Sequence, residues 1–232
     1  MKYLLSKILV VSVFAVTSFA HASGMQPDTS VVLVDAGVGE GTINVTNTSS
    51  QTMLLYTEIK NVPEDQEELL IVTSPISRVE GREKQLVRFI FQSDRPLLTQ
   101  RLKRVIFEGI PPNSEKGKNQ LNMTVSQNLP IIISPANLPV NNQPWKLLKW
   151  ELNDKIIRVS NDSPYVVRFN KSFKLIPIDV DLEFPRTYML PGQVDEIQVP
   201  SGTQVSSDIK IRFNPASIYG YQGVSYEASL VY

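Results

Sequence analysis

The sequence predicts an all-β protein built from two β-sandwich domains. Short runs that are apolar, or that alternate between apolar and polar residues, recur about every ten residues, and Gly, Pro, Asn and Asp separate them. No stretch shows the sustained apolar stripe of an amphipathic helix. Residues 138–144 interrupt the pattern with two prolines and two asparagines, which indicates a linker between the two domains.

The residues before the first predicted strand look like a secretory signal. Lys2 and Lys7 make the start basic, residues 8–19 are mostly apolar, and Ala20-His21-Ala22 offers small residues where a signal peptidase cleaves. The apolar run is shorter than the ~20 residues that a membrane-spanning helix needs. We therefore expect residues 1–22 to be removed, with cleavage before Ser23, and the rest of the chain to be exported.

The remaining chain of about 210 residues suits two domains of about 100 residues each. We assign residues 23–138 to the first domain, 139–144 to the linker and 145–232 to the second domain. The strands predicted in the first domain are residues 29–34, 42–46, 53–59, 85–91, 103–107 and 120–133. Those predicted in the second domain are residues 145–150, 156–159, 165–169, 186–190, 193–199, 207–213 and 224–231.

The composition excludes several classes of function. The chain has no cysteine, and its one histidine, His21, leaves with the signal, so cysteine nucleophiles, Ser-His-Asp triads and most zinc sites are excluded. We predict no enzyme and no cofactor. The signal removes two of the 23 lysines and arginines, which leaves 21 against 23 acidic residues and no basic block for nucleic acid. The acidic run of residues 64–68 is interpreted as a solvated turn.

Residues 120–127 alternate strictly and form the most informative predicted strand. Leu121, Met123 and Val125 point to one side of it, and the polar residues between them point to the other. Periodicity by itself favours an ordinary sandwich strand with one face in the core of its own domain.

A series of short motifs runs along nearly the whole mature chain in a particular order. In the first domain these are Val45-Thr46-Asn47, Ser74-Pro75 with Arg78, Leu86-Val87-Arg88, Gly109-Ile110-Pro111-Pro112 and Ser134-Pro135-Ala136-Asn137-Leu138. In the second domain they are Asn161-Asp162-Ser163-Pro164-Tyr165, Pro191-Gly192 and Tyr219-Gly220. Each motif is weak alone, but their shared order resembles the periplasmic pilus chaperones, the PapD-like family.

This resemblance implies two immunoglobulin-like domains set at an angle, with a cleft between them. It also implies a periplasmic protein that binds and folds pilus subunits by lending them a β-strand, and that delivers them to an outer-membrane usher. Leu121, Met123 and Val125 would then be the side chains that fill the incomplete sandwich of a subunit. The exposed strand edge also lets the free protein pair with itself.

Two basic residues that the family uses to hold the carboxyl end of a subunit are missing here. Ser30 and Pro130 stand at their positions. We name Arg104 and Lys103 as candidates for a substitute carboxylate anchor, because neighbouring residues of a strand point to opposite faces and one of them could reach the cleft. The alternative is that both are surface charges. We expect contacts other than the family's buried charges to hold the domains together, since Ser134 and Ile218 occupy two of those positions.

Two other functions are weighed against the chaperone. A two-domain pilus adhesin or other surface-structural β protein would share the fold, but an adhesin needs an incomplete second domain, and subunits usually carry a disulfide. An enzyme or small-ligand carrier on an immunoglobulin-like scaffold is disfavoured by the missing histidine and cysteine. The partners we expect are pilus subunits and the usher, with no nucleic acid and no small-molecule substrate.

Overall fold

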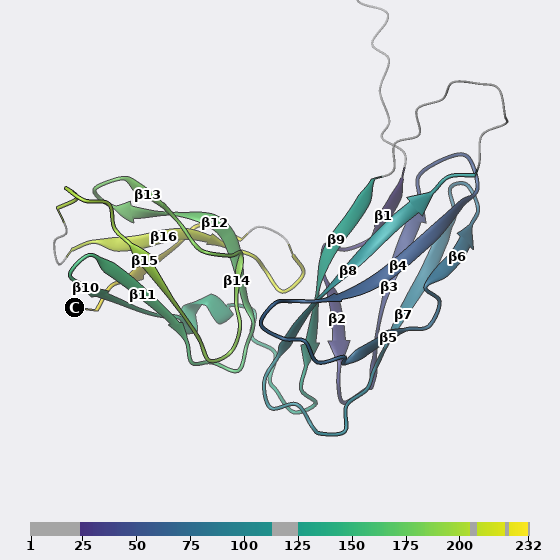
Figure 1. Cartoon of the computed structure of the whole chain (residues 1–232), viewed down its shortest axis with the longest axis horizontal. Coiled ribbons are helices and arrows are strands. Elements are labelled where there is room, and N and C mark those ends of the chain that lie inside the picture. Colours follow the sequence, from purple (N-terminus) through teal and green to yellow (C-terminus); the bar gives the residue numbers. More distant parts are fainter. Residues whose placement is uncertain (1–23, 113–124, 205–207, 221–222, 232) are drawn as a thin grey trace, which may run out of the picture.

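The computed structural model describes residues 24–112, 125–204, 208–220 and 223–231. Figure 1 shows two separate β domains that meet near the middle of the molecule at an angle to each other. None of the described helices is long and apolar enough to cross a membrane. The prediction of an all-β, two-domain protein is therefore confirmed.

The first domain is a sandwich of two strand layers that β2 connects. Its strands are β1 (Met25–Pro27), β2 (Val32–Asp35), β3 (Glu40–Asn47), β4 (Met53–Asn61), β5 (Leu70–Val72), β6 (Ile76–Val79), β7 (Lys84–Phe91), β8 (Arg101–Ile110) and β9 (Ser126–Ser134). One layer has the order β5-β7-β3 with β1 paired to β3, and the other has the order β9-β8-β4-β6. β2 pairs with β3 at one end and runs parallel to β9.

Alternating side chains of the strands form the buried core of the first domain. Ile43 and Val45 of β3 point inward, as their spacing predicts, and they join Val105 and Phe107 of β8 in one buried cluster. Asn47 is buried at the end of β3, and its amide donates to three backbone carbonyl groups, those of Gln51, Val79 and Glu80. These bonds satisfy the buried amide and hold the turns around it.

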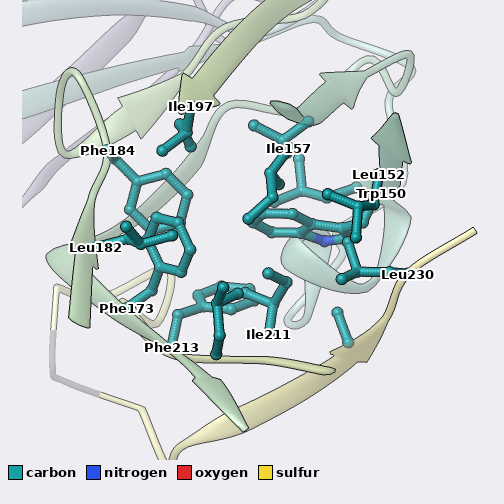
Figure 2. Close-up of a cluster of buried hydrophobic side chains, with 14 of the residues drawn as sticks. Trp150, Leu152, Ile157, Phe173, Leu182, Phe184, Ile197, Ile211, Phe213 and Leu230 are labelled. Carbon is teal, nitrogen blue, oxygen red and sulfur yellow. The ribbon is translucent and has the colours of Figure 1, made fainter. Parts of the chain in front are cut away.

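The second domain is a sandwich of a three-stranded sheet, β10-β11-β15, and a sheet of order β13-β12-β16-β17. Its elements are the 3-10 turn η1 (Pro144–Leu147), β10 (Lys149–Asn153), β11 (Ile156–Asn161), β12 (Val167–Ile176), β13 (Val180–Glu183), β14 (Tyr188–Met189), β15 (Gln193–Gln198), β16 (Lys210–Pro215) and β17 (Tyr226–Ser229). Trp150 lies between the two sheets against Phe173, Phe184 and Phe213 (Figure 2), at ring-centroid distances of 5.6–6.3 Å. These aromatic contacts supply much of the apolar surface that this domain buries.

Several strand boundaries differ from the prediction for physical reasons. Residues 145–150 were expected as one strand, but Pro144 begins a 3-10 turn and β10 starts only at Lys149. The short strands β5, β6 and β13 were missed because runs of three or four residues carry too little periodicity to be recognised. The strand expected at residues 120–133 is described from Ser126 onward, so Leu121 and Met123 lie outside the described residues.

Candidate functional site

The first half of β9 has a free backbone edge among the described residues. Residues 126–130 pair only with β8, from Ser126 opposite Glu108 to Pro130 opposite Arg104. β2 covers the other edge of β9 only from Ile131, which it meets at Val32. The start of β9 therefore offers unpaired N–H and C=O groups to an incoming strand.

A groove lies beside this free edge. Val125, Gln127 and Leu129 line it on one side, and the segment of residues 24–30 lines it on the other, around a cavity of about 450 Å³. Val125 is half exposed, and Leu129 packs partly against the core of the first domain. The alternating row thus begins at exposed Val125, directly before β9, and runs along β9 to buried Ile131.

Hydrogen bonds and ion pairs connect the two domains. Gln100 accepts a hydrogen bond from the backbone N–H of Val166 at 2.9 Å, and its own N–H donates to the carbonyl of Pro164 at 2.8 Å. Glu64 of the first domain forms an ion pair with Arg186 and accepts a hydrogen bond from Tyr188 at 2.9 Å. Burial and this bond raise the pKa of Tyr188 to about 12.

An apolar cluster fills the space between these polar contacts. It contains residues from both domains, namely Val31, Val62, Leu102, Ile132 and Val166, with Tyr188 and Leu190 packed against it. Together with the polar contacts it forms the interface between the two domains, whose residues could not be identified from the sequence. Ser134 takes part through its hydroxyl group, which accepts a hydrogen bond from the Gln100 amide at 3.0 Å.

Arg104 points toward this junction. It lies on the same face of β8 as Leu102, two residues away, which packs in the apolar cluster between the domains. Its guanidinium donates to the side-chain oxygen of Asn128 at 2.8 Å and to the backbone carbonyl of the same residue at 2.7 Å. Both acceptors are neutral, so the charge of Arg104 is held in place without being paired.

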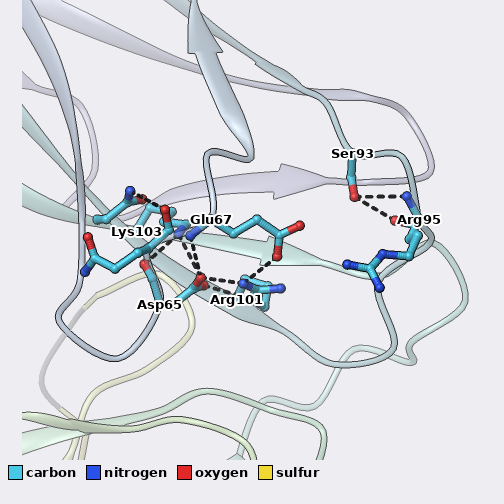
Figure 3. Close-up of polar contacts among 8 residues, drawn as sticks. Asp65, Glu67, Ser93, Arg95, Arg101 and Lys103 are labelled. Atoms are coloured by element: carbon cyan, nitrogen blue, oxygen red, sulfur yellow. Dashed lines mark hydrogen bonds and ion pairs between the residues drawn. The ribbon is translucent and has the colours of Figure 1, made fainter.

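Lys103 points the other way, into the first domain (Figure 3). Its side chain is 1% exposed, and its Nζ lies 3.1 Å from Asp65 Oδ1 and donates to the Asp65 carbonyl at 2.9 Å. Burial lowers the pKa of Lys103 despite this partner. Arg101 also forms an ion pair with Asp65 and with Glu67.

The interpretation of residues 64–68 as a solvated turn is therefore wrong for Asp65, which is buried. Burial alone would raise the pKa of its carboxyl group, but the hydrogen bonds and charges of Arg101 and Lys103 outweigh burial and lower the pKa. The sequence offered one usable signal: the two basic residues of β8, Arg101 and Lys103, are two apart and share a face, so a single acid can serve both.

Arg168 is a residue of this junction that the sequence analysis missed. It lies in β12 of the second domain, and its guanidinium donates to the Ser217 carbonyl at 2.7 Å. Burial, and then the neighbouring charge of Arg104, lower its pKa to about 10. Among the described residues no carboxylate forms an ion pair with Arg104 or Arg168, whereas Arg186 nearby has two such partners, Glu64 and Asp195.

The two positions that lack the family's basic residues have identifiable neighbours. Ser30 Oγ lies 3.4 Å from the carbonyl oxygen of Tyr219, and a Cβ atom on Gly220 would come within 2.1 Å of the same hydroxyl. A small residue at position 30 therefore leaves room for this turn of the second domain. Pro130 is buried in β9 opposite Arg104, on the edge that β2 does not reach.

The described chain resembles known proteins in both sequence and structure. Residues 24–139 match the family described as pili and flagellar-assembly chaperone, PapD N-terminal domain. The fimbrial chaperone YhcA of Escherichia coli K12 is 42% identical over 221 residues, which are 94% of this chain and 96% of the relative. The Salmonella enterica SafA pilin complex with the SafB chaperone matches with a TM-score of 0.72 and 17% identity, covering 91% of this chain and 98% of the matched chain. The E. coli chaperone DraB matches with a TM-score of 0.71 and 18% identity, covering 90% and 100%. The chain therefore belongs to the PapD-like family of pilus assembly chaperones.

Proposed function

We propose that this chain is a periplasmic chaperone that binds and folds pilus subunits by donor-strand complementation and delivers them to an outer-membrane usher. The observation that carries the proposal is the free first half of β9, with its alternating side chains beside an open groove. This is the geometry that β-augmentation needs, because backbone groups supply affinity and alternate side chains fill pockets. The role needs no catalytic step.

The donor row extends beyond the described part of β9. Val125 and Leu129 are its described apolar members. Leu121 and Met123, which lie outside the described residues, continue the same alternation in the sequence. Burial of each such side chain in a subunit contributes about 1.5–3 kcal/mol before the cost of association is subtracted.

The substitute carboxylate anchor in this proposal is Arg104, and Arg168 of the second domain acts beside it. Both guanidinium groups lie at the domain junction, and both bind only neutral acceptors among the described residues. A carboxylate from the bound subunit would relieve the repulsion between two neighbouring positive charges and accept charge-assisted hydrogen bonds from both. Lys103 is a poorer candidate, because it already binds Asp65 inside the first domain.

The test is capture of a subunit in the periplasm. The chain is expressed together with a pilus subunit of the same organism, and the soluble complex is purified and quantified. Val125→Glu should reduce the yield of complex at least 100-fold, because it places a charge among the apolar pockets of the subunit. Ser126→Lys is the matched control, since it adds a charge to the next residue on the opposite face of the strand, where Glu108 stands across from it, and should leave capture unchanged. Equal capture by both variants would rule out strand lending along this edge.

A further inference from the structure

The donor row contains one amide among apolar side chains. On the face of β9 that turns toward the groove, Val125, Gln127 and Leu129 follow one another. Gln127 stands directly opposite Phe107 in the β8–β9 register, and Leu129 stands opposite Val105. Phe107 and Val105 are both fully buried. The Gln127 amide therefore sits on the core-facing side of the strand, at the point where the core opens into the groove.

This amide has no hydrogen-bond partner among the described residues. Three of its polar neighbours across the groove already have partners of their own. Thr48 Oγ1 exchanges hydrogen bonds with the backbone of Gly24, Thr29 Oγ1 donates to the Val31 carbonyl, and Asp28 forms an ion pair with Lys84. In the open groove Gln127 is partly exposed, so water can reach the amide.

A strand that pairs with the free edge of β9 would close the groove and remove this water. A buried amide without a hydrogen-bond partner opposes binding strongly, whereas an amide that meets a polar side chain does not. The bound strand can provide that partner only if it places a polar residue opposite position 127. Because side chains alternate along a strand, a slip by one residue turns the bound strand over, and a slip by two replaces the facing residue.

We propose that Gln127 determines the register and the choice of subunit, by pairing with a polar side chain on the strand that a subunit adds to β9. This inference rests on the proposed function, because it assumes that a subunit strand occupies the groove. The side chains of this row would then have two different roles in binding. Val125 and Leu129 supply apolar contact in whatever register the strand takes, and Gln127 admits only the register in which its amide is satisfied.

The experiment replaces the amide by a thioether of nearly the same size. Gln127→Met is compared with the original chain for its affinity to the co-purified pilus subunit and for the register of the added strand. The register is read by disulfide trapping between a Ser126→Cys background and single cysteines placed along the subunit strand. We expect Gln127→Met to bind about 5- to 100-fold more weakly and to trap subunit cysteines at more than one position. Ser126→Met is the matched control on the opposite face, measured for affinity without the trapping background, and should change nothing.

A second substitution, in the subunit, separates a direct contact from an indirect one. The trapping at position 126 fixes the register, and the neighbouring subunit residue that this register places opposite position 127 is changed to Leu. Combined with Gln127→Met, this change should restore affinity, while combined with Gln127 it should weaken binding by the same 5- to 100-fold. Unchanged or tighter binding of Gln127→Met in a single register would overturn the inference. Loss of capture by Val125→Glu would in that case still support strand lending, so the two proposals fail separately.

Discussion

The two halves of β9 are one continuous strand, but their surroundings differ completely. From Ile131 to Ile133 the strand lies between β2 and β8, and Ile131 and Ile133 are fully buried. From Ser126 to Pro130 it pairs with β8 alone and lines a groove. The buried half packs in the core of the first domain. The free half has one backbone edge without a strand partner among the described residues, and some of its side chains line the groove. A folded domain can therefore offer a strand without unfolding, because the other half of that strand keeps it in place.

The two faces of β8 differ in the same way, one serving the core of the first domain and the other facing the domain junction. One face of β8 carries Lys103, which is buried with Asp65 and serves the stability of the first domain. The other face carries Arg104, which binds only neutral groups at the domain junction. Adjacent basic residues therefore have different environments because the alternation of a strand directs them to opposite sides.

The largest expected effect tests the two halves of β9 directly. Ile131→Ala should lower the free energy of unfolding by about 3–4 kcal/mol, because it leaves a cavity in a fully buried site. Val125→Ala, at the residue directly before the free half of β9, should lower it by less than ~1 kcal/mol, because that side chain is half exposed. Urea denaturation followed by circular dichroism measures both. Similar losses in the two variants would contradict the division of β9 into a structural half and a free half.

The next largest effect tests the two faces of β8. Lys103→Ala should cost about 2–3 kcal/mol of stability, since Asp65 stays buried and keeps only Arg101 as its ion-pair partner among the described residues. Arg104→Ala should cost less than ~1 kcal/mol of stability but weaken subunit binding about 10- to 100-fold, through loss of charge-assisted hydrogen bonds. Thermal denaturation and titration with the purified subunit measure the two quantities. Normal subunit binding by Arg104→Ala would exclude Arg104 as the carboxylate anchor.

The smallest effect is on the dependence of stability on pH. The pKa of Asp65 is lower in the folded protein than in the unfolded chain, so the ionised carboxylate adds stability above the unfolded pKa. That contribution is lost as the pH falls through the folded pKa. Asp65→Asn should therefore be less stable near neutral pH and should lose less stability than the original chain on acidification below about pH 4. Parallel stability curves for the two proteins between pH 7 and pH 3 would exclude this role for Asp65.

Part of the candidate site was accessible from the sequence. Alternation placed Val125 in one row of side chains, and the resemblance to the family predicted a donor role for this row and an anchor role for the adjacent cations of β8. Neither argument could tell which of Lys103 and Arg104 faces the second domain. The alternation of a strand shows only that the two side chains point to opposite faces, not which face each one takes. Arg168 was not found at all, since nothing local distinguishes it from any other arginine of an amphipathic strand.

The sequence by itself determined that the chain is all-β with two domains, and that it has no cysteine and a single histidine, His21, to serve catalysis. Those features depend on local composition and on a period of two residues, which any short window reveals. Only the tertiary structure decided which half of β9 is free, which charge is buried with Asp65, and which arginines meet at the junction. These depend on residues far apart in the chain that come together in space, such as β2 with β9 and Arg104 with Arg168, and local sequence carries no record of such proximity.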